Sequence, residues 1–390
     1  MNPSASGWIN KLLNELSQDN SLFMYSNAKY YNALRESGFI YGSNINNVGA
    51  IFAKSDLSAE EISKINLLLS LLYIQNQIAP KIDSVLSIID FYIDINAHKT
   101  SIFQDILGEK KSNTLLEKII NKRVQINDNI LVKNFNYFVI NALLFVDVLA
   151  YKEYLKKGHV SSIYIKNLEA AIEAIALDVL NAKAIKTEYD MSLIKLFESS
   201  RRYQNISHIS YNQAIKLLHS DLEKYYILDI ACMATWGDRT IDKTEQAFLH
   251  QLGLNLNLDR HIVEQSILTV NRFYTDNKDN IALLSSKNIV KSFYDNSSKM
   301  VSKLISRNGK RLKKELQQSK ELMLLLSHST VRDLSKEEQK RAQEQLLDVF
   351  KTIPSLAIFM LPGGALLLPL FVKFIPKLLP SAFDDNRIEE

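Results

Sequence analysis

The amino-acid sequence predicts an all-α protein, with a multi-helix soluble body followed by a C-terminal apolar membrane segment that prolines break. Three observations lead to this class. Apolar residues make up 46% of the 390 residues, which is enough to form real cores. Glycine and proline are scarce before the C-terminal segment, so long stretches lack the turn-forming residues that separate strands and form hairpins. Five of the seven prolines lie between Pro354 and Pro380.

Residues 1–205 form the first helical region. A serine followed three residues later by glutamate, as at Ser58 and Glu61, is a capping box that starts a helix, and Pro80 ends the apolar pattern that follows. The region carries no motif that assigns a function. Its expected helices span 8–18, 29–38, 58–78, 81–96, 112–124, 129–155, 161–184 and 190–200, with a loop at 41–52.

Residues 206–290 show a compact helical pattern, with helices expected at 211–218, 221–236, 242–252 and 259–274. The stretch LDIACMATWGDRTIDKTEQAFLHQLG, residues 228–253, resembles the tellurite-resistance TerB-like helical domain. That family has a helix rich in small residues, a turn of the form D-G-x-I-D-x-x-E and an acidic start to the next helix. This chain departs from the pattern at Arg239, where the family usually has glycine.

The TerB resemblance implies a candidate divalent-cation site. Carboxylate oxygens are the ligands that Ca²⁺ and Mg²⁺ prefer. A second interpretation needs no metal: D-x-x-E is also a capping box, and aspartate is a common turn residue. The candidate ligands are Asp229, Asp238, Asp242 and Glu245.

Residues 291–352 are predicted to form basic amphipathic helices. Thirteen Lys and Arg stand against seven Asp and Glu between Lys299 and Lys351, and Ser335 with Glu338 forms a further capping box. Such a surface suits anionic lipid headgroups or ribosomal RNA phosphates, and a merely solvated basic face is the third interpretation. The candidate basic surface consists of Lys303, Arg307, Lys310, Arg311, Lys313 and Lys314.

Residues 353–383 form the apolar membrane segment, and an acidic tail follows at 384–390. Twenty uncharged residues, 353–372, approach the length of a membrane-crossing helix. Proline and glycine interrupt that helix, so a kinked span, a re-entrant hairpin, an interfacial helix pair and a tail folded onto the soluble helices all remain open. The segment is marked by Pro354, Pro362, Gly363, Gly364, Pro369, Lys373, Pro376 and Pro380.

This proline spacing, with the ending from Leu379 to Phe383, resembles the membrane segment of leucine-zipper/EF-hand transmembrane (LETM-type) proteins over residues 297–385. The whole chain resembles the bacterial LETM-related biofilm-associated proteins. The resemblance implies two functions, which are cation/proton exchange and the tethering of ribosomes to a membrane. Ala365 stands where the mitochondrial members have an acidic residue, and proton-coupled transport normally needs an ionisable group inside the membrane.

The remaining composition narrows the class of function. A net charge of +4 is too mild for a dedicated DNA binder, and the single cysteine, Cys232, excludes an intramolecular disulfide. No nucleophile-elbow, phosphate-loop or zinc-protease motif is present, so we expect no enzyme and no cofactor beyond the candidate cation. The N-terminus has no signal-peptide pattern.

The sequence therefore favours a non-enzymatic scaffold at the inner membrane of a bacterium, facing the cytoplasm. Its expected partners are membrane lipid, ribosomes and further copies of itself. A cation/proton exchanger that acts as an oligomer, and so affects K⁺ or Ca²⁺ homeostasis, is the alternative.

Overall fold

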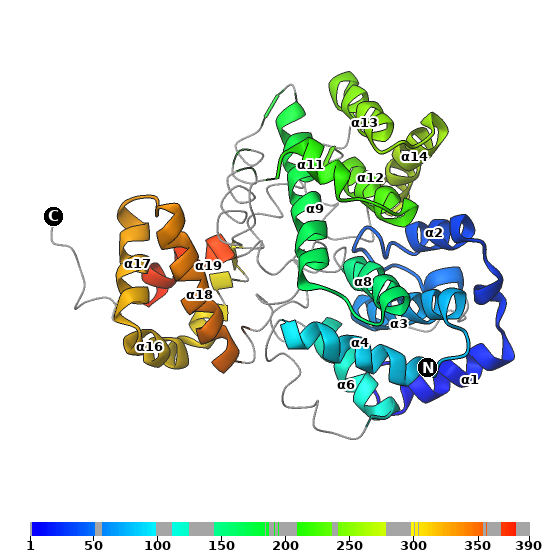
Figure 1. The fold of residues 1–390 in the computed structure, drawn as a ribbon, viewed down its shortest axis with the longest axis horizontal. Coiled ribbons are helices and arrows are strands. Elements are labelled where there is room, and N and C mark those ends of the chain that lie inside the picture. The colour runs from blue at the N-terminus through cyan, green and yellow to red at the C-terminus, as the bar shows by residue number, and fades with distance from the viewer. Residues whose placement is uncertain are drawn as a thin grey trace.

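A computed structural model describes residues 2–50, 57–98, 111–124, 144–183, 209–235, 241–277, 304–353 and 368–379, with a few isolated positions between them. Throughout these ranges the regular elements are helices and no strand occurs, which confirms the all-α prediction. The helices fall into two groups, residues 2–277 and residues 304–379, which lie next to each other in Figure 1.

The first group contains α1 (Trp8–Gln18), η1 (Ser21–Met24), α2 (Asn27–Glu36), η2 (Val48–Ala50), α3 (Ala59–Ile78), α4 (Ser84–His98), α6 (Asn113–Val124), α8 (Leu144–Lys157), α9 (Ser162–Ala182), α11 (Tyr211–Lys216), α12 (Asp221–Thr235), α13 (Lys243–Asn255) and α14 (Arg260–Asn277). The second group contains α16 (Gly309–Gln318), α17 (Lys320–Val331), α18 (Lys336–Thr352) and α19 (Leu368–Leu378).

Helix α3 forms the centre of the first group. It begins at the predicted capping box, in which Ser58 accepts from the Glu61 amide and Glu61 accepts from the Ser58 amide. Its side chains are buried on every side, from Ile65 to Tyr73, as expected for a helix that is apolar all round. Helices α6 and α8 pack against it, and α4 and α1 contact α6.

Helix α9 connects this centre to a second set of helices, α11 to α14. In Figure 1 it runs as one long helix from α8 to α11, and α12 and α13 also pack along it. Helix α12 in turn contacts α14, and α14 returns to the N-terminal helix α2. Tyr41, which follows α2, also contacts Phe273 of α14, and their ring centroids are 4.8 Å apart. Residues far apart in the sequence are therefore brought together between α2, α12 and α14.

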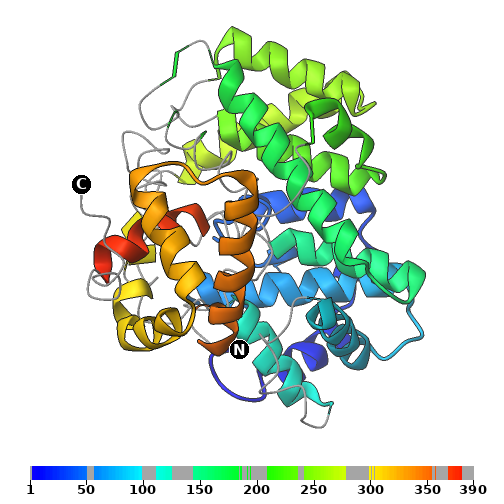
Figure 2. The same cartoon turned by 60° about the vertical axis from the view of Figure 1, so that its left-hand side comes forward.

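Helices α16 to α19 pack mainly on one another. Helix α17 contacts the other three, and the view in Figure 2 brings this group forward as a separate layer. Its core is apolar and fully buried, with Leu316, Leu326, Leu346, Phe350 and Phe371 as members. Helix α19 therefore completes a small helical bundle.

The described half of the apolar segment folds onto the other helices. Helix α19 buries Leu370, Phe371 and Ile375 within the bundle, although Pro376 lies inside the helix. Across the described part of the chain, no helix combines the length and the apolarity needed to cross a membrane. The segment residues Pro354, Pro362, Gly363, Gly364 and Pro380 lie outside the described residues.

Candidate functional site in the C-terminal helices

Helix α16 carries its charges on one side and its core residues on the other. Leu312 and Leu316, four residues apart, are fully buried. Lys310, Arg311 and Lys314 are exposed and lie on the opposite side of the helix, as the 3.6-residue period requires. The helix has four basic residues and one acidic residue, Lys313 being the fourth base and Glu315 the acid. Its outer face is therefore strongly positive.

Ion pairs within the bundle leave this positive face uncompensated. Glu338 binds Arg332 on the opposite side of the α17–α18 turn, and Glu321 binds Arg341 between α17 and α18. Four predicted basic-surface residues form no ion pair with any described residue, and all four are exposed; they are Arg307, Lys310, Arg311 and Lys314. Lys303 lies outside the described residues.

Helix α19 adds two further exposed bases. Lys373 and Lys377 lie four residues apart and point outward, while the buried Phe371 packs edge-on against Phe350 with centroids 4.7 Å apart. The apolar side of α19 is therefore held by aromatic packing. Leu378, at the end of the helix, keeps 37% of its surface exposed.

The end of α19 lies against the start of α16. A Cβ atom on Gly309 would come within 3.2 Å of the Cδ2 atom of Leu379. Such a distance is tighter than ordinary van der Waals contact, so glycine lets the two helix ends approach each other. This contact puts the basic residues of α19 and α16 in the same small bundle.

The predicted cation ligand Asp229 has protein partners for both of its oxygens. Arg35 donates from Nε to Oδ2 at 2.8 Å and from Nη2 to Oδ1 at 3.0 Å, and the Tyr31 hydroxyl donates to Oδ2 at 2.7 Å. Arg35 Nη2 also donates to Ser266 Oγ. Asp229 is fully buried, and the carboxylate serves as the counter-ion of a buried guanidinium. Its position therefore gives no support to a role as a metal ligand.

The capping interpretation of Asp242 and Glu245 is confirmed. Asp242 Oδ1 accepts from the Glu245 amide at 2.8 Å, and Glu245 Oε2 accepts from the Asp242 amide at 2.9 Å. The second Glu245 oxygen lies 3.9 Å from Lys183 Nζ. No group of three or more His, Cys, Asp or Glu side chains within the described residues is arranged to hold a metal. Asp238 lies outside those residues.

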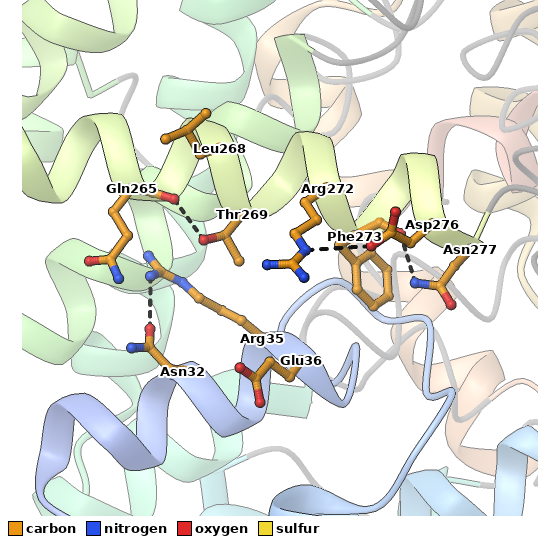
Figure 3. Close-up of a pocket in the computed structure, with 10 residues that line it drawn as sticks. All are labelled: Asn32, Arg35, Glu36, Gln265, Leu268, Thr269, Arg272, Phe273, Asp276 and Asn277. Carbon is orange, nitrogen blue, oxygen red and sulfur yellow. Dashed lines mark hydrogen bonds and ion pairs between the residues drawn. The ribbon is translucent and has the colours of Figure 1, made fainter.

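Arg35 also lines a polar cavity of about 470 Å³ between α2 and α14, shown in Figure 3. Asn32 accepts from Arg35 Nη1 at 3.2 Å, and Arg272 on the facing helix pairs with Asp276 at 3.5 Å. Both arginines therefore have counter-ions within the protein. Sequence reasoning missed this network, since Arg35 and Asp229 are 194 positions apart and Arg35 lies in no recognisable motif.

A comparison with known protein families found a match in the C-terminal helices. Residues 334–390 match the family described as LETM1-like, RBD. The C-terminal region of this chain is LETM1-like. A 53-residue stretch is 42% identical to the mitochondrial proton/calcium exchanger protein of Drosophila melanogaster, and it covers 14% of this chain and 5% of the fly protein. No solved structure was found to match the chain.

The LETM1-like match begins one residue before the N-cap of α18 and includes α18 and α19. It confirms the LETM-type resemblance and starts later than the predicted boundary at residue 297. The basic helix α16 precedes the matched residues but packs directly on α17 and α18. The TerB-like resemblance of residues 206–290 lies outside the match and stays a prediction.

Proposed function

We propose that this protein is a LETM1-like helical scaffold that associates with membranes through the positive face of α16. One observation carries the proposal: Arg307, Lys310, Arg311 and Lys314 are exposed without ion-pair partners among the described residues, in the bundle that contains the LETM1-like region. Helix α19, in the same bundle, carries two further exposed bases, Lys373 and Lys377.

The chemistry of this face fits anionic headgroups. Each Lys or Arg near an anionic bilayer surface contributes roughly 1 kcal/mol, and the attraction weakens over about a Debye length. Three bases on one helix face are thus sufficient for weak, salt-sensitive binding to a bilayer. Binding through this face would place the protein at the cytoplasmic side of a bacterial inner membrane.

Vesicle sedimentation tests this proposal. The full chain is mixed with vesicles of phosphatidylcholine alone or with a third of the lipid replaced by phosphatidylglycerol. We expect binding to the anionic vesicles and its loss in K310E/R311E/K314E. A matched control, K166E/K216E/K243E, makes the same change in net charge on exposed residues of other helices and should still bind.

Two results would overturn the lipid proposal. Equal loss of binding in both triple variants would show that only net charge matters. Binding to purified ribosomes with no binding to either vesicle would replace lipid with RNA phosphate as the partner of α16, since phosphates bind basic helices without sequence readout.

Cation/proton exchange is the second candidate, favoured by the 42% identity to part of a proton/calcium exchanger protein. A single broken span cannot enclose a pathway, so this function would need an oligomer. Residues 353–372 also contain no titratable side chain. Proteoliposomes that contain the purified protein test this function. Calcium uptake driven by a proton gradient would support exchange, and no uptake in vesicles shown to contain the protein would rule exchange out.

A further inference from the structure

A second cavity, of about 540 Å³, lies in the first helical group, far in sequence from the LETM1-like region. Three elements line it: the C-terminal half of α8, the first turns of α9 and the residues that lead into α12. Its polar lining includes Lys152, Lys156, Ser161, Asn167, His219 and Ser220. The cavity is therefore rich in groups that donate hydrogen bonds.

Two lysines of this cavity form no ion pair with any described residue. Lys152 and Lys156 lie four residues apart on α8, so their side chains occupy the same face of the helix. Lys152 is half-buried and Lys156 is exposed. Burial and the neighbouring charge of Lys156 lower the pKa of Lys152. Two adjacent cations, one of them partly desolvated, favour a bound anion.

The acidic residues of the cavity are already engaged. Glu223 Oε1 accepts from the Tyr164 hydroxyl at 2.6 Å, and its Oε2 accepts from the amides of His219 and Ser220 at 2.7 and 2.9 Å. Glu153 forms an ion pair with Lys157 at 2.5 Å. Neither carboxylate is within ion-pair distance of Lys152 or Lys156. The N–H groups of both ammonium ions can therefore donate hydrogen bonds to a bound ligand.

His159 at the rim is also engaged, because its Nδ1 lies 2.9 Å from Asp94. Lys152 and Lys156 lie where α8 faces the start of α9 and the residues before α12, and the longer-range attraction of Glu223, Asp221 and Glu153 offsets part of the charge of Lys152. Two ammonium groups surrounded by hydroxyl and amide donors match a phosphate group better than a carboxylate, since phosphate offers more acceptor oxygens.

We propose that this cavity binds a small phosphate-bearing anion, with Lys152 and Lys156 holding the phosphate. Ser161, Asn167 and Ser220 supply the neutral donors. The volume of about 540 Å³ exceeds that of inorganic phosphate alone, so it leaves room for a second phosphate or for an attached organic group. This ligand would bind independently of the membrane proposed for α16.

Calorimetric titration with sodium pyrophosphate tests the site on the full chain at low salt. We expect binding to the natural chain and an affinity at least about tenfold weaker in K152M/K156M, because each lost hydrogen bond to a charged group costs roughly that factor or more. The matched control is K166M, an exposed lysine of α9 outside the cavity, whose affinity should be unchanged. Ribose 5-phosphate, titrated in parallel, distinguishes an organic phosphate from a polyphosphate.

Acylation of lysines gives a second measurement that does not depend on the variants folding. Pyrophosphate should protect Lys152 and Lys156 from an amine-reactive ester, as quantified by peptide mass spectrometry, and leave Lys166 unprotected. Equal protection of all three lysines, or equal weakening in K166M, would overturn the proposal. K310E/R311E/K314E should bind pyrophosphate as the natural chain does, so this site and the membrane proposal can fail separately.

Discussion

The two helical groups differ in the ion pairs that they bury. Among the described residues of 2–277, two arginine–aspartate pairs are buried in addition to surface pairs such as Arg272–Asp276. A tyrosine hydroxyl donates to each buried aspartate: Tyr31 to Asp229, which pairs with Arg35, and Tyr92 to Asp147, which pairs with Arg123. In residues 304–379, the ion pairs Arg332–Glu338 and Arg341–Glu321 are at the surface, with arginine side chains 50% and 58% exposed.

This contrast shows what stabilises each group. A buried ion pair adds little net stability over an apolar core, but the loss of one partner is costly because the other charge stays buried. The first group therefore depends on particular long-range pairings. The C-terminal bundle depends on apolar packing and helix caps, which leaves its outer charges available for binding.

The largest effect that the comparison predicts is at Asp229. We expect D229N to lower the free energy of unfolding by about 3–5 kcal/mol, because Arg35 would remain buried without a counter-ion. Urea unfolding followed by circular dichroism measures the loss. The double variant R35M/D229N should be more stable than D229N, since it removes the uncompensated charge.

The metal hypothesis for Asp229 is tested by the same measurement. If the loss arises from the Arg35 pair, it should be the same with EDTA and with millimolar calcium. A D229N defect that appears only when calcium is present would instead make Asp229 a cation ligand and contradict the role as a counter-ion.

The sequence predicted helices well where a local signal marks their ends. Helix α1 spans the predicted residues 8–18, and the capping boxes at Ser58, Asp242 and Ser335 each begin a helix as predicted. The box is a short-range pattern of side chain and backbone, so it can be read without knowing the fold.

Helix α2 shows where weaker signals mislead. The prediction of 29–38 is shifted by two residues, because Ser26 accepts from the Lys29 amide and starts the helix at Asn27. The chain leaves the helix at Gly38, which has φ of +79°. Ser26 lacks the acidic residue three positions on that completes a box, since Lys29 stands there.

Long-range partners could not be predicted from the sequence. The Arg35–Asp229 pair joins residues 194 positions apart, and the cavity at Lys152 needs α8, α9 and the residues before α12 to meet. Folding of Leu368–Leu378 onto α17 was one of four arrangements that the proline pattern left open. Apolar composition fits either a bilayer or a protein core, so only tertiary packing decides between them.

The next prediction concerns the aromatic packing that holds α19. Phe371 is fully buried against Phe350, so F371A should cost about 3 kcal/mol. We expect faster amide hydrogen exchange in α17 and α19 and no change in α3, because the C-terminal bundle has its own core. F374A is the matched control: Phe374 is only half-buried on the same helix and should cost less. Increased exchange in α3 would contradict the separation into two groups.

A smaller effect is expected at the start of α18. Ser335 Oγ accepts from the Glu338 amide at 3.3 Å, and replacing an N-cap serine by alanine costs about 1 kcal/mol. S335A should therefore increase hydrogen exchange in the first turn of α18, while S329A, on α17 and outside any cap, should leave that turn unchanged. An S335A chain with unchanged exchange at Glu338 and Gln339 would show that the cap adds no local stability.

The smallest expected effect is the pH dependence of the same cap. Hydrogen bonds from Arg332, followed by the Ser335 amide, lower the pKa of Glu338 from 4.5 to about 2. A carboxylate whose pKa is lower in the folded state stabilises that state above its unfolded pKa, and the contribution is lost as pH falls through the folded pKa. The first turn of α18 should therefore loosen between pH 4.5 and pH 2. The NMR chemical shift of the Glu338 carboxyl group should titrate near pH 2 in the natural chain and closer to pH 4.5 in R332M. Equal midpoints in the two chains would show that Arg332 does not cause the lowered pKa.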